Sequence, residues 1–187
     1  MKRIIFLTIF LLGIYFNAQV VSLTSATNLS TGMYLKDLDN ILSPFVGEWT
    51  AKYEKNQVIL RIEKVEKFFF EYKEQKLSYH MDILFLRYTI KDSSGKEIFS
   101  TLNKKVTDDD ALLSDSASPN IVGFLYSGEG EGCHVGKGMI HLTYKNPTHM
   151  SWEYISDDEP IDKSKCPSTD NIKSYIPKSY ELIFTKQ

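Results

Sequence analysis

The feature that most constrains the fold of this chain is a two-residue alternation of apolar and polar side chains, which recurs from residue 47 onwards. It is clearest at 47–53, where Trp49, Ala51 and Tyr53 alternate with polar residues. Successive side chains of a β-strand point to opposite faces of a sheet, so this period is typical of a strand with one buried face. The chain is therefore expected to fold mainly as β-sheet.

Further segments of the same kind predict seven more strands, at 58–63, 81–91, 96–102, 120–127, 139–144, 150–155 and 180–185, with 68–72 either extending the first of these or pairing separately. Turn signals at 92–95 and 145–149 join neighbouring strands as hairpins. The polar stretch 103–119 is expected to be a long loop or an edge crossover, and 156–179 is expected to be a second long loop. This spacing predicts an all-β antiparallel meander of about eight strands, closed into a barrel or, as the alternative, folded as a β-sandwich.

One segment before the strands has a helical period. Leu35, Leu38 and Ile41 recur at helical spacing, and Pro44 lies just beyond them. We expect a short amphipathic helix over 34–42, stopped near the proline. The preceding residues 19–33 are rich in Ser and Thr without a period and are expected to be a flexible lead-in. Residues 34–187 are then a single β domain.

The first 18 residues have the pattern of a secretory signal peptide. Lys2 and Arg3 precede an apolar run over 4–16, and Ala18 supplies a small residue for cleavage. The run is about 13 residues long, whereas a membrane-spanning helix needs about 20. We therefore expect a secreted or periplasmic protein with no membrane span after signal cleavage.

Charge excludes one class of partner. Without residues 1–18 the chain has 169 residues, of which 20 are basic and 24 acidic, and the basic residues are scattered. Such a balance gives no electrostatic surface for nucleic acid. In an oxidising compartment the two cysteines, Cys133 and Cys166, are expected to form a disulfide, with two free thiols as the alternative.

The sequence contains no catalytic, metal or cofactor motif that stands out, so no catalytic residue is predicted and the protein is expected not to be an enzyme. The Gly-rich stretch 128–138 lacks the spacing of a phosphate-binding loop. His134, His141 and His149 are candidates to converge on a metal, against the simpler interpretation that they, like His80, are isolated surface residues. The acidic clusters 108–110 and 157–159 are either solvated loops or calcium ligands.

At Phe45-Val46-Gly47-Glu48-Trp49 the chain resembles the lipocalin and fatty-acid-binding superfamily, whose members open their first barrel strand with Gly-x-Trp. The resemblance implies a barrel with the Trp packed across its closed end. Members stack an Arg of the last strand on that Trp, where this chain has only Lys178 and Lys186 nearby. Segments 34–42, 45–49 and 81–102 also resemble small secreted bacterial proteins of uncharacterised function, which implies no activity.

An eight-stranded barrel has an interior just wide enough for one small ligand or for packed side chains alone. Six residues are candidates to face inward and to form the wall of a pocket for a small hydrophobic ligand: Trp49, Tyr53, Leu60, Ile62, Trp152 and Tyr154. The alternative is that they are ordinary core of a non-catalytic envelope or protein-interaction domain. A cavity of about 300 Å³ or more favours the first function, and a solid core favours the second.

Overall fold

The structure, a computed structural model, describes residues 19–25, 28–130, 132–157, 161, 164, 166 and 171–187, so the predicted signal peptide lies outside the described residues. The described part is an all-β fold with one 3-10 turn, η1, at Ser43–Phe45. No helix within it is long and apolar enough to cross a membrane. The strands are β1 (Val20–Ser22), β2 (Tyr34–Lys36), β3 (Gly47–Tyr53), β4 (Asn56–Tyr72), β5 (Leu77–Lys91), β6 (Glu97–Ser100), β7 (Leu112–Ser118), β8 (Ile121–Tyr126), β9 (Gly138–Asn146), β10 (His149–Ser156) and β11 (Leu182–Lys186).

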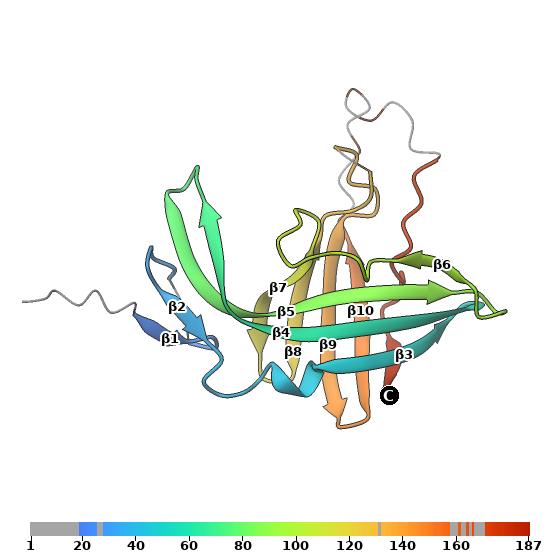
Figure 1. The fold of residues 1–187 in the computed structure, drawn as a ribbon, viewed down its shortest axis with the longest axis horizontal. Coiled ribbons are helices and arrows are strands. Elements are labelled where there is room, and N and C mark those ends of the chain that lie inside the picture. Colours follow the sequence, from blue (N-terminus) through green and yellow to red (C-terminus); the bar gives the residue numbers. More distant parts are fainter. Residues whose placement is uncertain are drawn as a thin grey trace, which may run out of the picture.

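Eight of these strands close into an antiparallel barrel. The hydrogen-bonded order runs β5-β4-β3-β11-β10-β9-β8-β7, and β7 pairs with β5 to complete the ring. In Figure 1, β4 and β5 run across the view while β8, β9 and β10 run up and down behind them. The prediction of an antiparallel barrel of about eight strands is confirmed, and the sandwich alternative is wrong.

The barrel interior is filled where the two-residue period places apolar side chains. Trp49 of β3 lies opposite Leu60 of β4, which lies opposite Tyr88 of β5. Trp49, Leu60, Phe124, Trp152 and Phe184 are fully or almost fully buried. Burying one large apolar side chain stabilises a fold by about 1.5–3 kcal/mol, so this shared interior is the main source of stability.

The end of the barrel near η1 is closed. Trp49 donates its indole N–H to the Phe45 carbonyl at 2.8 Å, which ties the first barrel strand to the 3-10 turn. The ammonium group of Lys186, near the end of β11, lies 5.0 Å from the centre of the Trp49 ring in a cation–π contact. Phe45 also packs edge-on against Tyr144 of β9. These contacts seal this end with side chains.

Strand β5 pairs with three different strands along the edge that faces away from β4. It pairs with β4 along nearly its whole length, but on the other side it pairs with β2 at residues 80–81, with β7 at 85–86 and with β6 at 89–91. Closure of the barrel therefore depends on the short pairing with β7. After this pairing, towards residue 91, β5 pairs with β6 and no longer with β7. The barrel wall is therefore incomplete at the end opposite η1.

The β4–β5 hairpin extends past the barrel, at the left of Figure 1. A bulge in β4 between Val65 and Phe68 marks where the extension begins. Strands β1 and β2 pair in parallel along its edge. Phe70, Tyr72 and Tyr79 stack on one another along this extension.

The helix predicted over 34–42 is wrong. Residues 34–36 form β2, and Leu38, which the helical period assigned to the buried face, is 58% exposed. The reason is Asp37. Its buried carboxylate accepts hydrogen bonds from the backbone N–H groups of Ile41 and Leu42, and it forms an ion pair with Lys64 at 2.7 Å. A carboxylate that bonds to the following backbone in this way competes with helix formation and favours a turn.

A second buried carboxylate, Asp82 of β5, joins this turn to the bulge. It accepts the Tyr34 hydroxyl at 2.6 Å and the backbone N–H groups of Asp37 and Lys67 at 3.0 and 2.8 Å. Burial alone raises the pKa of Asp82, but these three hydrogen bonds and the charge of Lys64 outweigh it and lower the pKa below its usual value. The network thus favours the ionised carboxylate and fixes β2 to β4 and β5.

In three further segments the structure differs from the expectation. The segment 103–119 is not a continuous loop, because its last part forms β7; Ser114 is buried there and its hydroxyl accepts the N–H of Leu84 at 2.8 Å. The predicted strand at 96–102 does form a hairpin with β5, as β6, but it lies off the barrel path. The segment 19–33, expected to be a flexible lead-in, contains β1 and the buried side chain of Met33.

The Asp82 network makes a prediction about stability. Because the folded-state pKa of Asp82 lies below its unfolded value, the network stabilises the fold above about pH 4, and the stabilisation is lost as the pH falls through the folded pKa. We expect Asp82→Asn to lower the free energy of unfolding at pH 7 by about 2 kcal/mol. The difference from wild type should shrink towards pH 3. Urea titrations measure both, and Glu74→Gln, in the exposed β4–β5 turn, is the control. Equal stability of Asp82→Asn and wild type at pH 7 would contradict this role.

Candidate functional site

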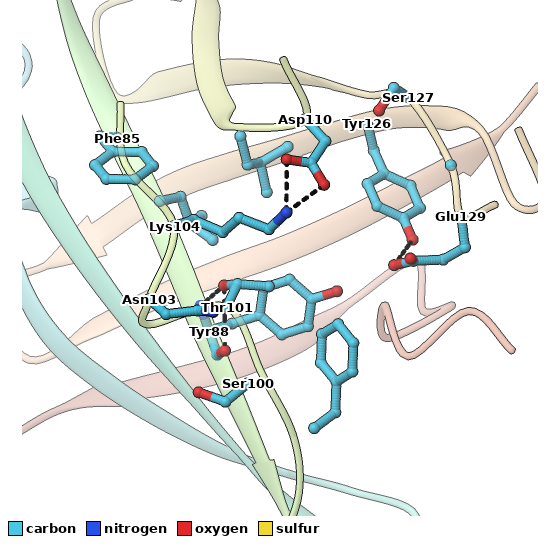
Figure 2. Close-up of a pocket in the computed structure, with 14 residues that line it drawn as sticks. Phe85, Tyr88, Ser100, Thr101, Asn103, Lys104, Asp110, Tyr126, Ser127 and Glu129 are labelled. Carbon is cyan, nitrogen blue, oxygen red and sulfur yellow. Dashed lines mark hydrogen bonds and ion pairs between the residues drawn. The ribbon is translucent and has the colours of Figure 1, made fainter. Parts of the chain in front are cut away.

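A cavity of about 260 Å³ lies at the incomplete end of the barrel wall. Its floor comes from β5 and β7, one side from β6 and the loop that follows it, and the other side from the end of β8 (Figure 2). The apolar part of its wall consists of Phe85, Leu86, Tyr88, Phe99, Leu112 and Tyr126. The volume lies just below the roughly 300–1,000 Å³ that is typical of ligand pockets.

Tyr88 is the central residue of this cavity. Only 3% of its surface is exposed, yet its hydroxyl has no hydrogen-bond partner among the described residues. Figure 2 shows this hydroxyl directed towards the side of the cavity that holds Tyr126 and Glu129. A buried hydroxyl without a partner costs about 1–3 kcal/mol, so its position is unfavourable for folding alone.

The backbone of Tyr88 is held firmly. Its N–H donates to the Thr101 hydroxyl at 2.8 Å, and its carbonyl accepts the N–H of Thr101 at 2.9 Å. The ring contacts Phe99 with 5.3 Å between ring centres. Burial, followed by the charges of Tyr126 and Glu129 and a weak interaction with the Tyr126 hydroxyl that does not have the geometry of a hydrogen bond, raises the pKa of the Tyr88 hydroxyl well above its usual value. The hydroxyl therefore stays protonated at neutral pH and can donate or accept a hydrogen bond.

The opposite wall carries a second phenol, which is paired. The Tyr126 hydroxyl donates to the Glu129 carboxylate at 2.6 Å and lies 3.3 Å from the Ser174 hydroxyl. Burial, and then the hydrogen bond to Glu129, raises the pKa of Tyr126. The cavity thus has one phenol with a hydrogen-bond partner and one without, in a wall that is partly aromatic and partly polar.

The loop at residues 101–111 covers one side of the cavity and is internally braced. Lys104 contacts both carboxylate oxygens of Asp110, at 2.8 and 2.6 Å. This hydrogen bond with Asp110 is the main cause of the raised pKa of Lys104. The Asp108 carboxylate accepts the backbone N–H of Lys105 at 3.0 Å. These local bonds give the loop a defined shape without a strand partner.

A more open groove of about 680 Å³ adjoins the cavity. It lies between the acidic cluster 108–110 and the Gly-rich loop after β8. Gly128 is required in that loop, because its φ is +81° and a Cβ there would lie 2.5 Å from the His134 carbonyl group. The predicted Cys133–Cys166 disulfide is present and fixes the same loop. Its 33-residue separation corresponds to about 3–4 kcal/mol in the chain-entropy account.

The six residues predicted to form a pocket wall lie elsewhere, and none of them lines this cavity. Trp49, Leu60, Ile62 and Trp152 are packed in the core, with at most 1% of their surface exposed. The Trp152 indole N–H donates to the Pro177 carbonyl at 3.0 Å, and the Tyr154 hydroxyl donates to the Gly136 carbonyl at 2.7 Å. Tyr53 lines a separate depression near the β3–β4 turn.

The other sequence candidates are dispersed. His134 lies in the Gly-rich loop, where its Nδ1 is 2.9 Å from the Ser127 carbonyl. His141 faces Glu153 on the outside of β9, and His149 begins β10 beyond the hairpin turn. Within the described residues no group of three or more His, Cys, Asp or Glu side chains is placed to hold a metal. The cluster 108–110 lines the groove, whereas most of 157–159 lies outside the described residues.

Sequence reasoning singled out neither Tyr88 nor Tyr126. Nothing in the sequence distinguishes Tyr88 from other aromatic residues of the strands, since its lack of a partner depends on where β6 and β8 lie.

The chain matches the Family of unknown function (DUF6705) over residues 1–187 and belongs to that family. No curated protein and no solved structure matches it.

Proposed function

We propose that this member of the family is a lipocalin-like binding protein that holds a small, largely apolar molecule in the Tyr88 cavity and catalyses no reaction. The observation that carries the proposal is the buried hydroxyl of Tyr88, a residue of the cavity wall, which has no hydrogen-bond partner among the described residues. Ligand sites are typically apolar hollows with a few polar groups that fix orientation. A ligand oxygen or nitrogen bonded to Tyr88 would satisfy the hydroxyl.

The closed end of the barrel supports the lipocalin-like part of the proposal. Trp49 packs across that end, as the Gly-x-Trp resemblance implies, and Lys186 covers its ring where lipocalins place an Arg. A barrel sealed at one end and incomplete at the other admits a ligand from one side only. The ligand is therefore held at the mouth, above the packed core, rather than between Trp49 and Trp152.

We also propose that the protein works outside the cytoplasm. The signal-peptide pattern of residues 1–18 and the Cys133–Cys166 disulfide support export to an oxidising compartment. Intact mass measurement of the protein from its own host tests this. A mass that retains residues 1–18 or shows two free thiols would contradict it.

A second candidate is the protein-interaction domain, which the packed barrel centre and the aromatic extension favour. Phe69 and Tyr72 of the extension are 51% and 42% exposed. Exposed aromatic residues are enriched where proteins bind one another. This function becomes the better one if the cavity binds no small molecule.

The binding proposal is tested with Prodan, a neutral fluorescent naphthalene ketone whose carbonyl can accept a hydrogen bond from Tyr88. We expect saturable binding to the wild type with a blue-shifted emission. Tyr88→Phe should weaken binding by about 3- to 10-fold, which corresponds to one hydrogen bond. The free energy of unfolding of the unliganded variant should stay the same or rise, because the unsatisfied hydroxyl is removed.

The matched control is Tyr53→Phe, which removes a hydroxyl that bonds to the Lys178 carbonyl away from the cavity. It should leave Prodan affinity unchanged. The absence of saturable binding to the wild type, or equal weakening by both substitutions, would overturn the proposal.

A further inference from the structure

The cavity and the groove form one continuous hollow. Their walls share Asp110, Ser127, Gly128 and Glu129. The cavity is the more enclosed part and contains the aromatic side chains, while the groove leads from these shared residues to the surface. A molecule longer than the 260 Å³ cavity would therefore extend into the groove.

The groove has a strongly one-sided charge. Its wall contains the carboxylates of Asp108, Asp109, Asp110 and Glu129. Among the described residues that line it there is no Lys or Arg, and His134 is the one other titratable group. Within a concave wall of low dielectric, carboxylates of one sign reinforce each other and attract a cation.

Most of this charge is not neutralised within the described structure. Lys104 forms its ion pair with Asp110, and its charge also acts at longer range on Asp108 and Glu129. Asp108, Asp109 and Glu129 form no ion pair among the described residues. Asp109 is exposed, and the one side-chain bond of Glu129 is the hydrogen bond from Tyr126. A cationic group in the groove would meet carboxylate oxygens that are free to bind it.

An independent feature favours an organic molecule over a bare ion in the same hollow. Tyr88 is buried, unpartnered and directed into the cavity, as Figure 2 shows. Phe85, Phe99 and Leu112 give the wall an apolar part, which suits a hydrocarbon body. Among the described residues no carboxylates are grouped as metal ligands, so a larger, organic cation suits the groove better than a metal ion.

Resting on the proposed function, we propose that the ligand is a small amphipathic cation, an amine with an aromatic or aliphatic body. The body occupies the cavity beside Tyr88 and Phe99, and the ammonium group lies in the groove among Asp108, Asp109 and Glu129. An anion with the same body is repelled by these carboxylates. The acidic cluster 108–110 is then the part of the site that selects the charge of the ligand.

The test compares three probes that share a naphthalene body and differ in charge: 2-(1-naphthyl)ethylamine, 2-(1-naphthyl)ethanol and 1-naphthylacetate. Calorimetry or naphthalene fluorescence with the full disulfide-bonded protein gives each dissociation constant. We expect the amine to bind at least five-fold more tightly than the alcohol, and the carboxylate to bind most weakly. Raising the salt from 50 to 500 mM should weaken only the binding of the amine.

The variant Asp109→Asn/Glu129→Gln removes two charges and retains an oxygen that accepts the Tyr126 hydrogen bond. It should lower the affinity for the amine to about that for the alcohol, whose own affinity should not change. The control is Glu71→Gln/Glu74→Gln at the far end of the β4–β5 hairpin, which changes net charge equally and should bind all three probes as the wild type does.

The outcomes separate the two proposals. If the alcohol binds and the amine binds no more tightly, the charge selection is wrong while the cavity proposal stands. If the control lowers amine affinity as much as the groove variant does, the selection is also wrong, because net charge would account for it. If none of the three probes binds, the cavity proposal itself fails.

Discussion

The structure depends on how β5 shares one edge among three partners. Its pairing with β7 comprises two residue pairs, Phe85 with Leu113 and Leu86 with Leu112, and the buried Ser114 hydroxyl adds a bond to the N–H of Leu84. This short contact closes the barrel. On one side of it β5 pairs with β2 and continues into the extension, and on the other it pairs with β6. The incomplete wall, and with it the cavity, follows from that division.

The two ends of the barrel differ for this reason. At the η1 end, the pairing of Trp49 with Lys186 between β3 and β11 brings these two residues together with Phe45, and the three close the interior. At the other end, two loops take the place of paired strands. One is the loop at residues 101–111, which is held by Lys104 and Asp110, and the other is the Gly-rich loop, which is held by the disulfide. Tyr88 lies at the boundary between these regions. Its ring belongs to the core, while its hydroxyl belongs to the cavity.

Much of the fold could be predicted from sequence because most of its strands have one solvent-exposed face and one buried face. The prediction for β3 has the same limits as the strand, since Trp49 and Ala51 alternate with exposed or half-buried residues. Strand β2 and the turn after it were mistaken for a helix, because the backbone conformation at Asp37 depends on Lys64 and Asp82, which are distant in the sequence. Strand β7 was missed because its small polar residues, such as Ser114, have no apolar period.

The site was predictable only in part. The acidic cluster 108–110, the Gly-rich loop and the disulfide were recognised as separate features, and the structure brings them to one groove. Residues such as Trp49 and Trp152 were reasonable candidates for a pocket wall, because an inward aromatic looks the same in a sequence whether it packs or lines a cavity. The distinction depends on the path of β6 and the loop after it, which no local pattern specifies.

The central claim is that the hollow beside Tyr88, and not the packed barrel centre or the aromatic extension, receives a ligand. Backbone amide NMR spectra of the isotope-labelled protein, recorded during titration with 2-(1-naphthyl)ethylamine, test it most directly. The account predicts that shifted resonances cluster at residues 85–88, 99–104, 108–112 and 126–129. Shifts confined to the extension at residues 66–81, or to the neighbours of Trp49 and Trp152, would contradict it.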